Sequence, residues 1–216
     1  MRQPTLHAFL RRAALALLLA SGSNLAAAGT IHVVLDTTSF GSTDGYVDMQ
    51  LSATSGMPLA TASVTGRSGF DPTAHIDSWG VTASGDGYLF RNDTSNDLYQ
   101  AVHFGDDLSF DLNFAGAPDP ASAYVSHFVL SAYDAGGAPL GTYDPFTGAL
   151  ADFSWTPAVA AGADGTIGAD ISDPGIVSYT ANKVPEPTDA LLVAAGLATM
   201  AIARRRGAAR ALPSAC

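Results

Sequence analysis

Histidine and aspartate are the side chains of this chain that could take part in a reaction, but their spacing predicts no catalytic site. Nucleophilic hydrolysis needs a serine, a histidine and an acid brought together. Four histidines lie in the middle of the chain: His32, His75, His103 and His127. No Gly-x-Ser-x-Gly elbow accompanies them, and no pair has the spacing of zinc ligands. We therefore expect these histidines to occupy ordinary strand positions.

Paired carboxylates are the second chemistry to consider. Glycoside hydrolysis typically uses a carboxylic acid of raised pKa facing a second carboxylate. Glu186 is the only glutamate in the chain, and the aspartates stand mostly in turn-like contexts. The single cysteine, Cys216, leaves no thiolate site in the middle of the chain. The sequence therefore favours a protein without enzymatic activity, and a hydrolase with an aspartate-based site stays open as a third hypothesis.

One oxygen-rich segment has side chains that suit calcium. It is residues 92–97, Asn-Asp-Thr-Ser-Asn-Asp, with Asp86 shortly before it. The spacing does not match an EF-hand, and a solvated hairpin loop is the favoured interpretation. We therefore expect no cofactor and no metal site, with calcium as the weaker alternative.

Several aromatic residues suggest a platform on one sheet that would stack against sugar rings. They are Trp79, Tyr88, Tyr99, Tyr143 and Trp155. For the two tryptophans, packing into the core is the favoured alternative because their large apolar area is normally buried.

Charge narrows the range of partners. Residues 29–183 hold 18 aspartates against three basic groups, Arg67, Arg91 and Lys183, which gives this segment a net charge of −15. Such a surface repels nucleic acid and anionic lipid headgroups, so nucleic acid is not expected as a partner. The aspartates are interpreted mainly as solubilising groups and turn formers.

The elements that position these residues are predicted to be short strands. Apolar and polar residues alternate in 31–35, 46–51 and 109–114, which is the period of a half-buried strand. Further strands are expected at 59–65, 75–82, 88–91, 98–104, 124–133, 140–143 and 176–180. Turn signals separate the strands, and no stretch of 29–183 keeps a helical period. Residues 29–183 are therefore predicted to be one all-β domain, an antiparallel β-sandwich or jelly roll.

Large aromatic residues are expected to fill the core of this domain. They are Phe70, Trp79, Phe90, Phe104, Phe110, Phe114, Phe128 and Trp155. Residues 157–175 are rich in alanine, glycine and aspartate, and a long loop is expected there.

Residues 1–28 have the parts of a secretory signal peptide in the usual order. A basic start, Met1–Arg12, precedes a helical apolar stretch, Ala13–Ala20, which is too short to span a membrane. Ala26 and Ala28 supply the small residues that signal peptidase reads, so cleavage is expected to leave Gly29 as the first residue. The general secretion machinery is the expected route. The alternative is a buried helix of the fold.

Residues 184–206 form a second targeting segment with three parts. The first part is rigid and extended because of its prolines, and consists of Val184, Pro185, Glu186 and Pro187. The second is a hydrophobic helix, predicted at 190–203. The third is a basic membrane stop on the cytoplasmic side, made of Arg204, Arg205 and Arg206, after which 207–216 form a cytoplasmic tail. The alternative is a plain C-terminal membrane anchor.

The order Pro185-Glu186-Pro187, apolar helix and arginine cluster resembles the PEP-CTERM sorting domain. The resemblance implies recognition by an exosortase, an integral-membrane cysteine protease or transpeptidase. It also implies processing near the Pro-Glu-Pro segment and delivery to the surface of a Gram-negative bacterium that makes exopolysaccharide. Segments 46–51, 108–112 and 128–134, followed by Asp144-Pro145, also resemble uncharacterised PEP-CTERM proteins.

Two functions follow as the main hypotheses. The leading one is an exported cell-surface or extracellular-matrix protein without enzymatic activity, processed by an exosortase and anchored in the inner membrane before processing. The alternative is a carbohydrate-binding module that acts on exopolysaccharide.

Overall fold

The computed structural model describes residues 26–27, 29–52, 56–121, 123–160 and 163–182. This part of the chain is all-β, in two antiparallel sheets, and contains no helix. The all-β, antiparallel part of the prediction is therefore confirmed. The apolar stretches 13–20 and 190–203 lie outside the described residues, as does the whole of 183–216.

The first sheet has the strand order β13-β2-β9-β4-β7-β6. Its strands are β2 (Thr30–Asp36), β4 (Ala60–Ser68), β6 (Thr82–Ser84), β7 (Gly87–Arg91), β9 (Asp107–Gly116) and β13 (Val177–Asn182). A two-residue strand, β1 (Ala26–Ala27), also pairs with the end of β9, at Ala115 and Gly116. Cleavage after Ala28 would remove this short pairing and leave the six main strands intact.

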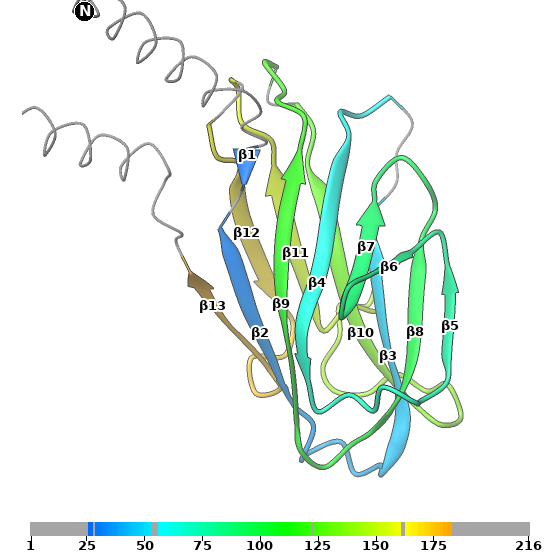
Figure 1. Cartoon of the computed structure of the whole chain (residues 1–216). Helices are drawn as coiled ribbons and strands as arrows, with labels where there is room; N and C mark the ends of the chain where they lie inside the picture. Colours follow the sequence, from blue (N-terminus) through cyan, green and yellow to red (C-terminus); the bar gives the residue numbers. More distant parts are fainter. Residues whose placement is uncertain (1–25, 28, 53–55, 122, 161–162, 183–216) are drawn as a thin grey trace, which may run out of the picture. The chain divides into compact units, whose positions relative to one another are not determined.

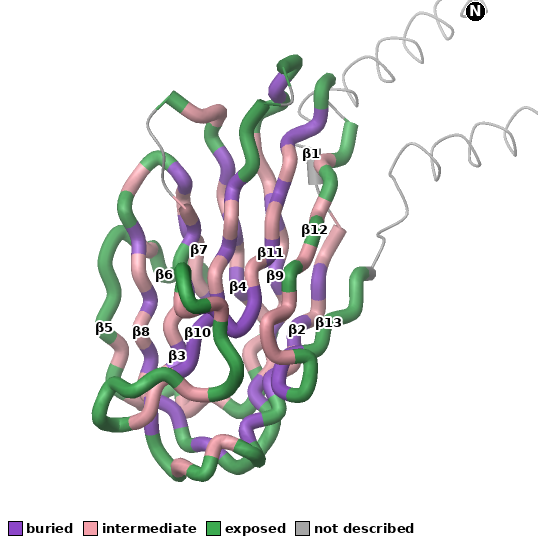
Figure 2. Tube along the Cα trace, turned by 180° about the vertical axis from the view of Figure 1, so that it is seen from behind, coloured by how far each residue is buried: buried purple, intermediate pink, exposed green. Residues whose placement is uncertain are grey.

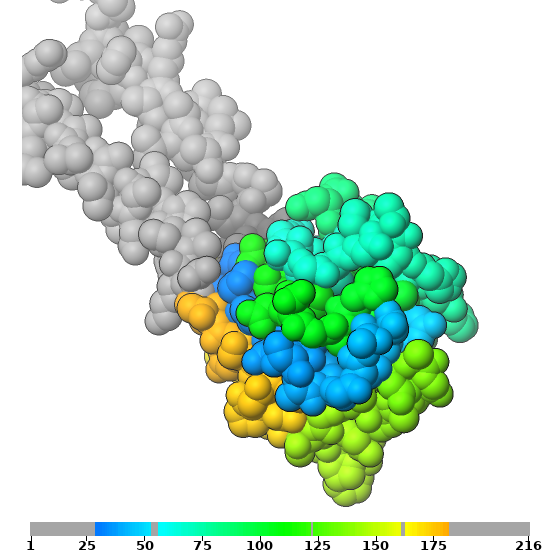
Figure 3. All heavy atoms as spheres, turned by 90° about the horizontal axis from the view of Figure 1, so that it is seen from below, coloured from blue at the N-terminus to red at the C-terminus, as the bar shows by residue number. Residues whose placement is uncertain are grey.

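The second sheet has the order β12-β11-β10-β3-β8-β5. Its strands are β3 (Asp44–Leu51), β5 (Ile76–Trp79), β8 (Asp97–His103), β10 (Ser126–Asp134), β11 (Ala151–Thr156) and β12 (Thr166–Ile171). Figure 1 shows the strands of the two sheets running side by side as two layers. At one end the β2–β3 and β8–β9 loops lie against each other, joined by Thr37, whose hydroxyl donates to the carbonyl of Asp106 over 2.6 Å (Figure 3).

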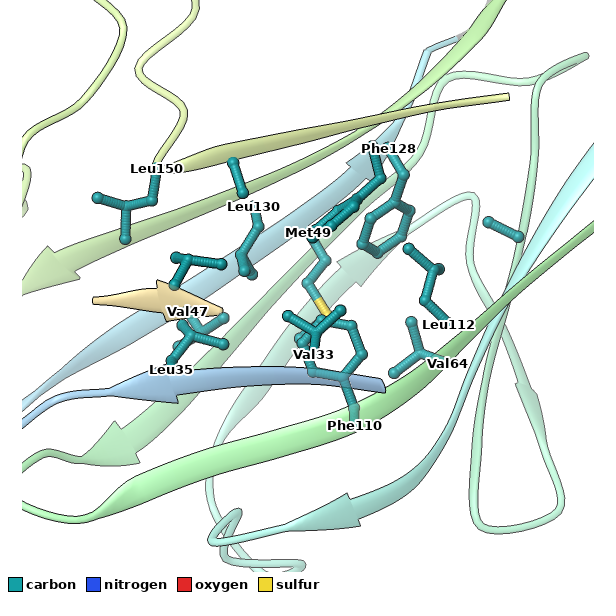
Figure 4. Close-up of a cluster of buried hydrophobic side chains, with 14 of the residues drawn as sticks. Val33, Leu35, Val47, Met49, Val64, Phe110, Leu112, Phe128, Leu130 and Leu150 are labelled. Carbon is teal, nitrogen blue, oxygen red and sulfur yellow. The ribbon is translucent and has the colours of Figure 1, made fainter. Parts of the chain in front are cut away.

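The core lies between the sheets because alternate residues of nearly every long strand point inward. Val33 and Phe110 of the first sheet face Val47 and Met49 of the second in a continuous buried cluster (Figure 4). Aromatic rings cross the same interface: Phe90 meets Phe128 edge-on at 5.2 Å between ring centroids. The predicted core residues Phe90, Phe104, Phe110, Phe114, Phe128 and Trp155 are buried, and Phe70 is half-buried against them.

One core prediction is wrong. Trp79 is 74% exposed, because β5 is the edge strand of the second sheet and its last residue faces outward. Figure 2 shows β5 as exposed over most of its length. The indole is therefore a surface group that no element of the described domain covers.

Two strand predictions and one loop prediction also need correction. No strand forms at 140–143, where Gly141 has a φ of +75°. The segment 75–82 is interrupted at Gly80 and divides between β5 and β6, which belong to different sheets. The expected loop 157–175 contains β12, which pairs with β11, a strand that was not predicted from the sequence.

Candidate binding surface

The outer face of the second sheet carries the side chains of β3, β5, β8 and β10 that point away from the core. Residues two apart on a strand share a face, and directly paired residues on neighbouring strands do too. Six of these residues form what we call the aromatic–acidic face: Tyr46, Asp48, Trp79, Asp97, Tyr99 and Tyr133. All six are at least partly exposed, whereas their neighbours Val47 and Leu98 are buried in the core.

Trp79 stands at the edge of this face, beside a carboxylate. Its partner in the antiparallel register is Asp97 of β8, and Asp77 is paired with Tyr99 in the same way. Cβ atoms of such pairs are about 4.5–5.5 Å apart. Directly after Trp79, Gly80 has a φ of +64°, and a Cβ there would lie 1.9 Å from the backbone oxygen of Ser95. Only glycine fits this turn, which fixes the end of β5 against the β7–β8 loop.

Three tyrosines continue the face across β8, β3 and β10. The rings of Tyr46 and Tyr99 stack at 4.4 Å between centroids with 17° between their planes, and Tyr99 lies 5.9 Å from Tyr133. The pKa of Tyr99 is raised, first by burial and then by its neighbours Tyr46 and Asp48. Tyr46 and Tyr99 are stacked, and the ring of Tyr133 is tilted by 45° against that of Tyr99, so the three tyrosines form one aromatic cluster on this face.

A carboxylate pair lies next to the tyrosines. Burial and the neighbouring Asp97 raise the pKa of Asp48 to about 7, although Gln50 donates a hydrogen bond to it over 3.0 Å. The Oδ1 atoms of Asp48 and Asp97 are out of contact with solvent and have no hydrogen-bond partner among the described residues. Two carboxylates in such surroundings disfavour a second negative charge. The pair therefore favours a bound proton or a cation nearby.

A shallow pocket borders the aromatic–acidic face at Tyr46. Its polar lining comes from Asp44, Asp71 and His103, and Ala101 of β8 is one of its apolar lining residues. The Asp44 carboxylate contacts Nδ1 of His103, and Thr73 donates its hydroxyl and its backbone N–H to Asp71. These two hydrogen bonds, with the charge of His103 a smaller cause, lower the pKa of Asp71. The pocket extends the acidic character of the face toward the end of the sheet.

Two of the five aromatic residues expected to form a sugar platform lie on one face of a sheet, and sugar binding stays a prediction. Trp79 and Tyr99 share one face, but Trp155 is fully buried in the core. Tyr88 belongs to the first sheet, with the guanidinium of Arg67 4.7 Å from its ring centroid. Tyr143 lies after β10 and outside every strand, 41% exposed.

Sequence analysis missed the tyrosines that join Trp79 to the rest of the sheet. Tyr46 and Tyr133 are paired directly across β3 and β10. The alternation in 46–51 was visible, and it assigned Tyr46 to the polar, outward set. The missing information was the strand order, which brings Tyr46, Tyr99 and Tyr133 together.

Three of the four histidines occupy strand positions, as expected, and each pairs with an aspartate. His32 contacts Asp111 at 2.8 Å across β2 and β9, and His127 contacts Asp152 at 3.0 Å across β10 and β11. His103 pairs with Asp44, as described above. His75 directly precedes β5. Within the described residues, none of these imidazoles has a serine hydroxyl hydrogen-bonded to it, and the pairs are cross-strand histidine–aspartate contacts.

The oxygen-rich segment 92–97 holds strands together through its two asparagines. Asn96 is buried, accepting from the backbone N–H of Leu51 over 2.7 Å and donating to the carbonyl of Leu51 over 2.8 Å. Asn92 is buried and makes the equivalent bond to the N–H of Ala60 over 2.8 Å. Asp93 pairs with Arg91 at 2.6 Å. Most oxygens of the segment are thus used within the protein, and the expectation of no metal site, with calcium as the weaker alternative, stays a prediction.

The remaining predicted site residues are at the two ends of the chain. Ala26 lies in β1, and Gly29 directly precedes β2, whereas Ala28 lies outside the described residues. The sorting motif, Val184, Pro185, Glu186 and Pro187, and the membrane stop, Arg204, Arg205 and Arg206, also lie outside them. Signal cleavage, sorting and membrane anchoring therefore stay predictions.

Comparison with protein-family models, with curated proteins and with solved structures finds no match for this chain. Within the part of the chain that the structure describes, no helix has the length and apolar character needed to cross a membrane. Among the same residues, no group of three or more histidine, cysteine, aspartate or glutamate side chains is arranged to hold a metal ion.

Proposed function

We propose that this chain is an exported cell-surface or extracellular-matrix protein of a Gram-negative bacterium, without enzymatic activity. The observation that carries the proposal is the agreement between the two ends of the sequence. A secretory signal at 1–28 directs the chain outward, and the apolar segment before Arg204–Arg206 holds those arginines on the cytoplasmic side. The net charge of −15 over 29–183 suits an exposed, wet location between them.

The partners in this proposal act one after another. The secretion machinery exports the chain, and signal peptidase cleaves between Ala28 and Gly29. The C-terminal helix then anchors the chain transiently in the inner membrane. An exosortase recognises Pro185–Pro187, cleaves near them, and releases or transfers the domain to the surface. The resemblance of 184–206 to the PEP-CTERM sorting domain supports this last step. No cofactor takes part.

Deletion of 184–206 tests this proposal in the native host. We expect the shortened chain to cross the inner membrane and to be lost from the cell surface, because nothing then presents it to the exosortase. Surface labelling of intact cells, followed by detection of this chain, measures delivery. A chain that lacks only 207–216 is the control and should be delivered normally. Unchanged delivery of the 184–206 deletion would contradict the proposal.

A second candidate function, polysaccharide binding through the aromatic–acidic face, is favoured by one structural observation. Trp79 presents an indole that is 74% exposed, beside Asp97 and in line with three tyrosines. Exposed aromatic rings stack against the apolar faces of sugars, and neighbouring carboxylates and amides accept or donate hydrogen bonds to hydroxyl groups. An exported protein in an exopolysaccharide matrix has such chains around it.

The substitution Trp79→Ala tests this second function. It removes the exposed ring without opening the core, so the domain should fold normally. We expect it to weaken retention of the mature protein on the host's own matrix polysaccharide by about 1–2 kcal/mol, roughly tenfold. Phe146→Ala is the matched control, because Phe146 is 94% exposed and lies outside the strands of this face. Equal retention of both variants would exclude Trp79 as a contact.

A further inference from the structure

We infer that the aromatic–acidic face binds polysaccharide that carries free amino groups, with the Trp79 indole stacked on a sugar ring and the carboxylates beside it facing the ammonium group. The inference rests on the glycan-binding function proposed above and names the chemical class of the ligand. It is carried by three features of this face: the position of Trp79, the sign of the charges around it, and the unmet needs of the carboxylate pair.

The position of Trp79 favours an extended chain of sugars over a protein partner. The indole lies at an open sheet edge, and its cross-strand neighbour is Asp97. Two residues earlier on β5, Asp77 is paired with Tyr99 in the same way. Asp77 and Ser78, which precede Trp79 on β5, are both exposed and polar. Protein interfaces form around contiguous apolar patches, and Trp79 has none beside it on β5. A single flat ring among hydrogen-bonding groups is the arrangement that suits a sugar.

The charges around Trp79 select the sign of the ligand. Asp77, Asp97 and Asp48 lie on this face within two strands of the indole, and the bordering pocket adds Asp44 and Asp71. The described basic side chains point elsewhere. Arg67 donates to Gln100 over 2.9 Å and lies over Tyr88, and Arg91 pairs with Asp93. The two histidines of the outer face, His103 and His127, are each held by an aspartate. An anionic polysaccharide would be repelled, and an ammonium group attracted.

The carboxylate pair adds a reason for the ammonium to lie close. Asp48 and Asp97 each keep an oxygen away from solvent without a hydrogen-bond partner among the described residues. Their mutual repulsion is relieved by a proton shared within the pair or by a positive charge beside it, and the described donor to the pair is the neutral amide of Gln50. A sugar stacked on Trp79 projects its ring substituents toward Asp97, its direct neighbour. A protonated amine there would bring three N–H donors and one positive charge.

The experiment compares three matched ligands on the mature protein by calorimetric titration at about 0.15 M salt, where long-range attraction is screened. The ligands are a hexamer of glucosamine, the same hexamer fully N-acetylated, and an anionic hexamer of uronic acid. We expect the glucosamine hexamer to bind at least tenfold more tightly than the N-acetylated one, and the uronic acid hexamer not to bind. Trp79→Ala should weaken both neutral and amino ligands about tenfold.

Charge-removing substitutions then separate a local contact from general attraction to an acidic protein. Asp97→Asn should remove most of the preference for the glucosamine hexamer and leave the N-acetylated hexamer unaffected. Asp77 is exposed, so Asp77→Asn should leave the fold intact. It should reduce the preference for the glucosamine hexamer over the N-acetylated hexamer about threefold. Asp86→Asn is the control of equal charge change, because Asp86 lies in the β6–β7 turn of the first sheet, and it should change nothing.

Each remaining outcome has a defined meaning. The N-acetylated or the uronic acid hexamer could bind as tightly as the glucosamine hexamer, or more tightly, and still depend on Trp79. That result would overturn the amino-group inference and leave glycan binding in place. Equal effects of Asp86→Asn and Asp97→Asn would reduce the preference to overall charge and overturn the inference as well. A lysine hexapeptide is titrated as an additional ligand that is not a sugar, and if it bound more tightly than the glucosamine hexamer and depended on Trp79, the glycan class would be overturned. If Trp79→Ala left the affinity for every ligand unchanged, both this inference and the glycan-binding function on which it rests would be overturned.

Discussion

Asp48 is the residue whose surroundings differ most from those of a surface aspartate. Burial and the neighbouring Asp97 raise its pKa from the ordinary value of 3.8 to about 7. The folded protein therefore holds a proton on this pair at a pH where the unfolded chain has released it. The contribution to stability is present below pH 4 and is lost as the pH rises from about 4 to about 7. The direction is opposite to that of a salt-bridged aspartate.

The substitution Asp48→Asn tests this reading of the pair. The amide cannot ionise, and it can donate to Asp97 in place of the shared proton. We expect Asp48→Asn to stabilise the domain by about 1–2 kcal/mol at pH 8, after allowance for solvent screening of a half-buried group, and to have little effect at pH 4.5. Urea unfolding at the two pH values measures the difference. Asp86→Asn, in an exposed turn, should show no such pH dependence, and a loss of stability in Asp48→Asn at both pH values would contradict the account.

Trp79 shows why residue type alone misplaces a side chain. A tryptophan has the largest apolar area to bury, so the core was the favoured position. Whether that area is buried depends on the face of β5 to which it belongs and on what covers that face. Both are properties of the sheet, in which β5 has a neighbour on one side only. The structure places Trp79 on the surface, and sugar stacking by its indole stays a prediction.

At the scale of elements, alternation along the chain predicted the strands whose two faces have different environments. Val47, Met49 and Leu51 all point into the core, as do Phe110, Leu112 and Phe114. Residues 151–156 alternate in the same way, with Ala151, Phe153 and Trp155 buried, so β11 was present in the sequence and overlooked. β12 was harder to find, because the glycine, alanine and aspartate between its two isoleucines have low strand propensity.

The asparagines of the β7–β8 loop illustrate a limit of reading motifs. Asn92 and Asn96 have the oxygen ligands of a cation site, but their amides bond backbone groups of β4 and β3. Each asparagine thereby replaces ladder partners at the end of a strand, where buried backbone groups would otherwise be unpaired. The composition of the segment is the same for both roles. Only the approach of β3 and β4 to the loop distinguishes them.

The aromatic–acidic face could not be predicted from the sequence for a related reason. Its six residues come from strands β3, β5, β8 and β10, which span residues 44–134 and are adjacent only after the chain has crossed between the sheets several times. Outward alternation assigns Tyr46 and Asp48 to one face of β3. The order β10-β3-β8-β5 then brings Tyr133, Tyr99 and Trp79 to that same face.

At the scale of the whole molecule, the described domain lies in sequence between the two proposed targeting segments. The described domain ends at Asn182, and the proposed sorting segment begins two residues later. Processing near Pro185–Pro187 would therefore free the sandwich without cutting a strand. Signal cleavage after Ala28 likewise leaves β2, which begins at Thr30, complete. The cut after Ala28 removes the two-residue strand β1, and the cut near Pro185–Pro187 lies beyond Asn182, the last residue that the structure describes.

The intact mass of the mature protein, recovered from the surface or medium of its native host, tests the central claim of export and processing most directly. The account predicts a chain that starts at Gly29 and ends close to Pro185–Pro187, with any group added by the exosortase at that new end. A protein of the full 216 residues, carrying both end segments, would contradict it.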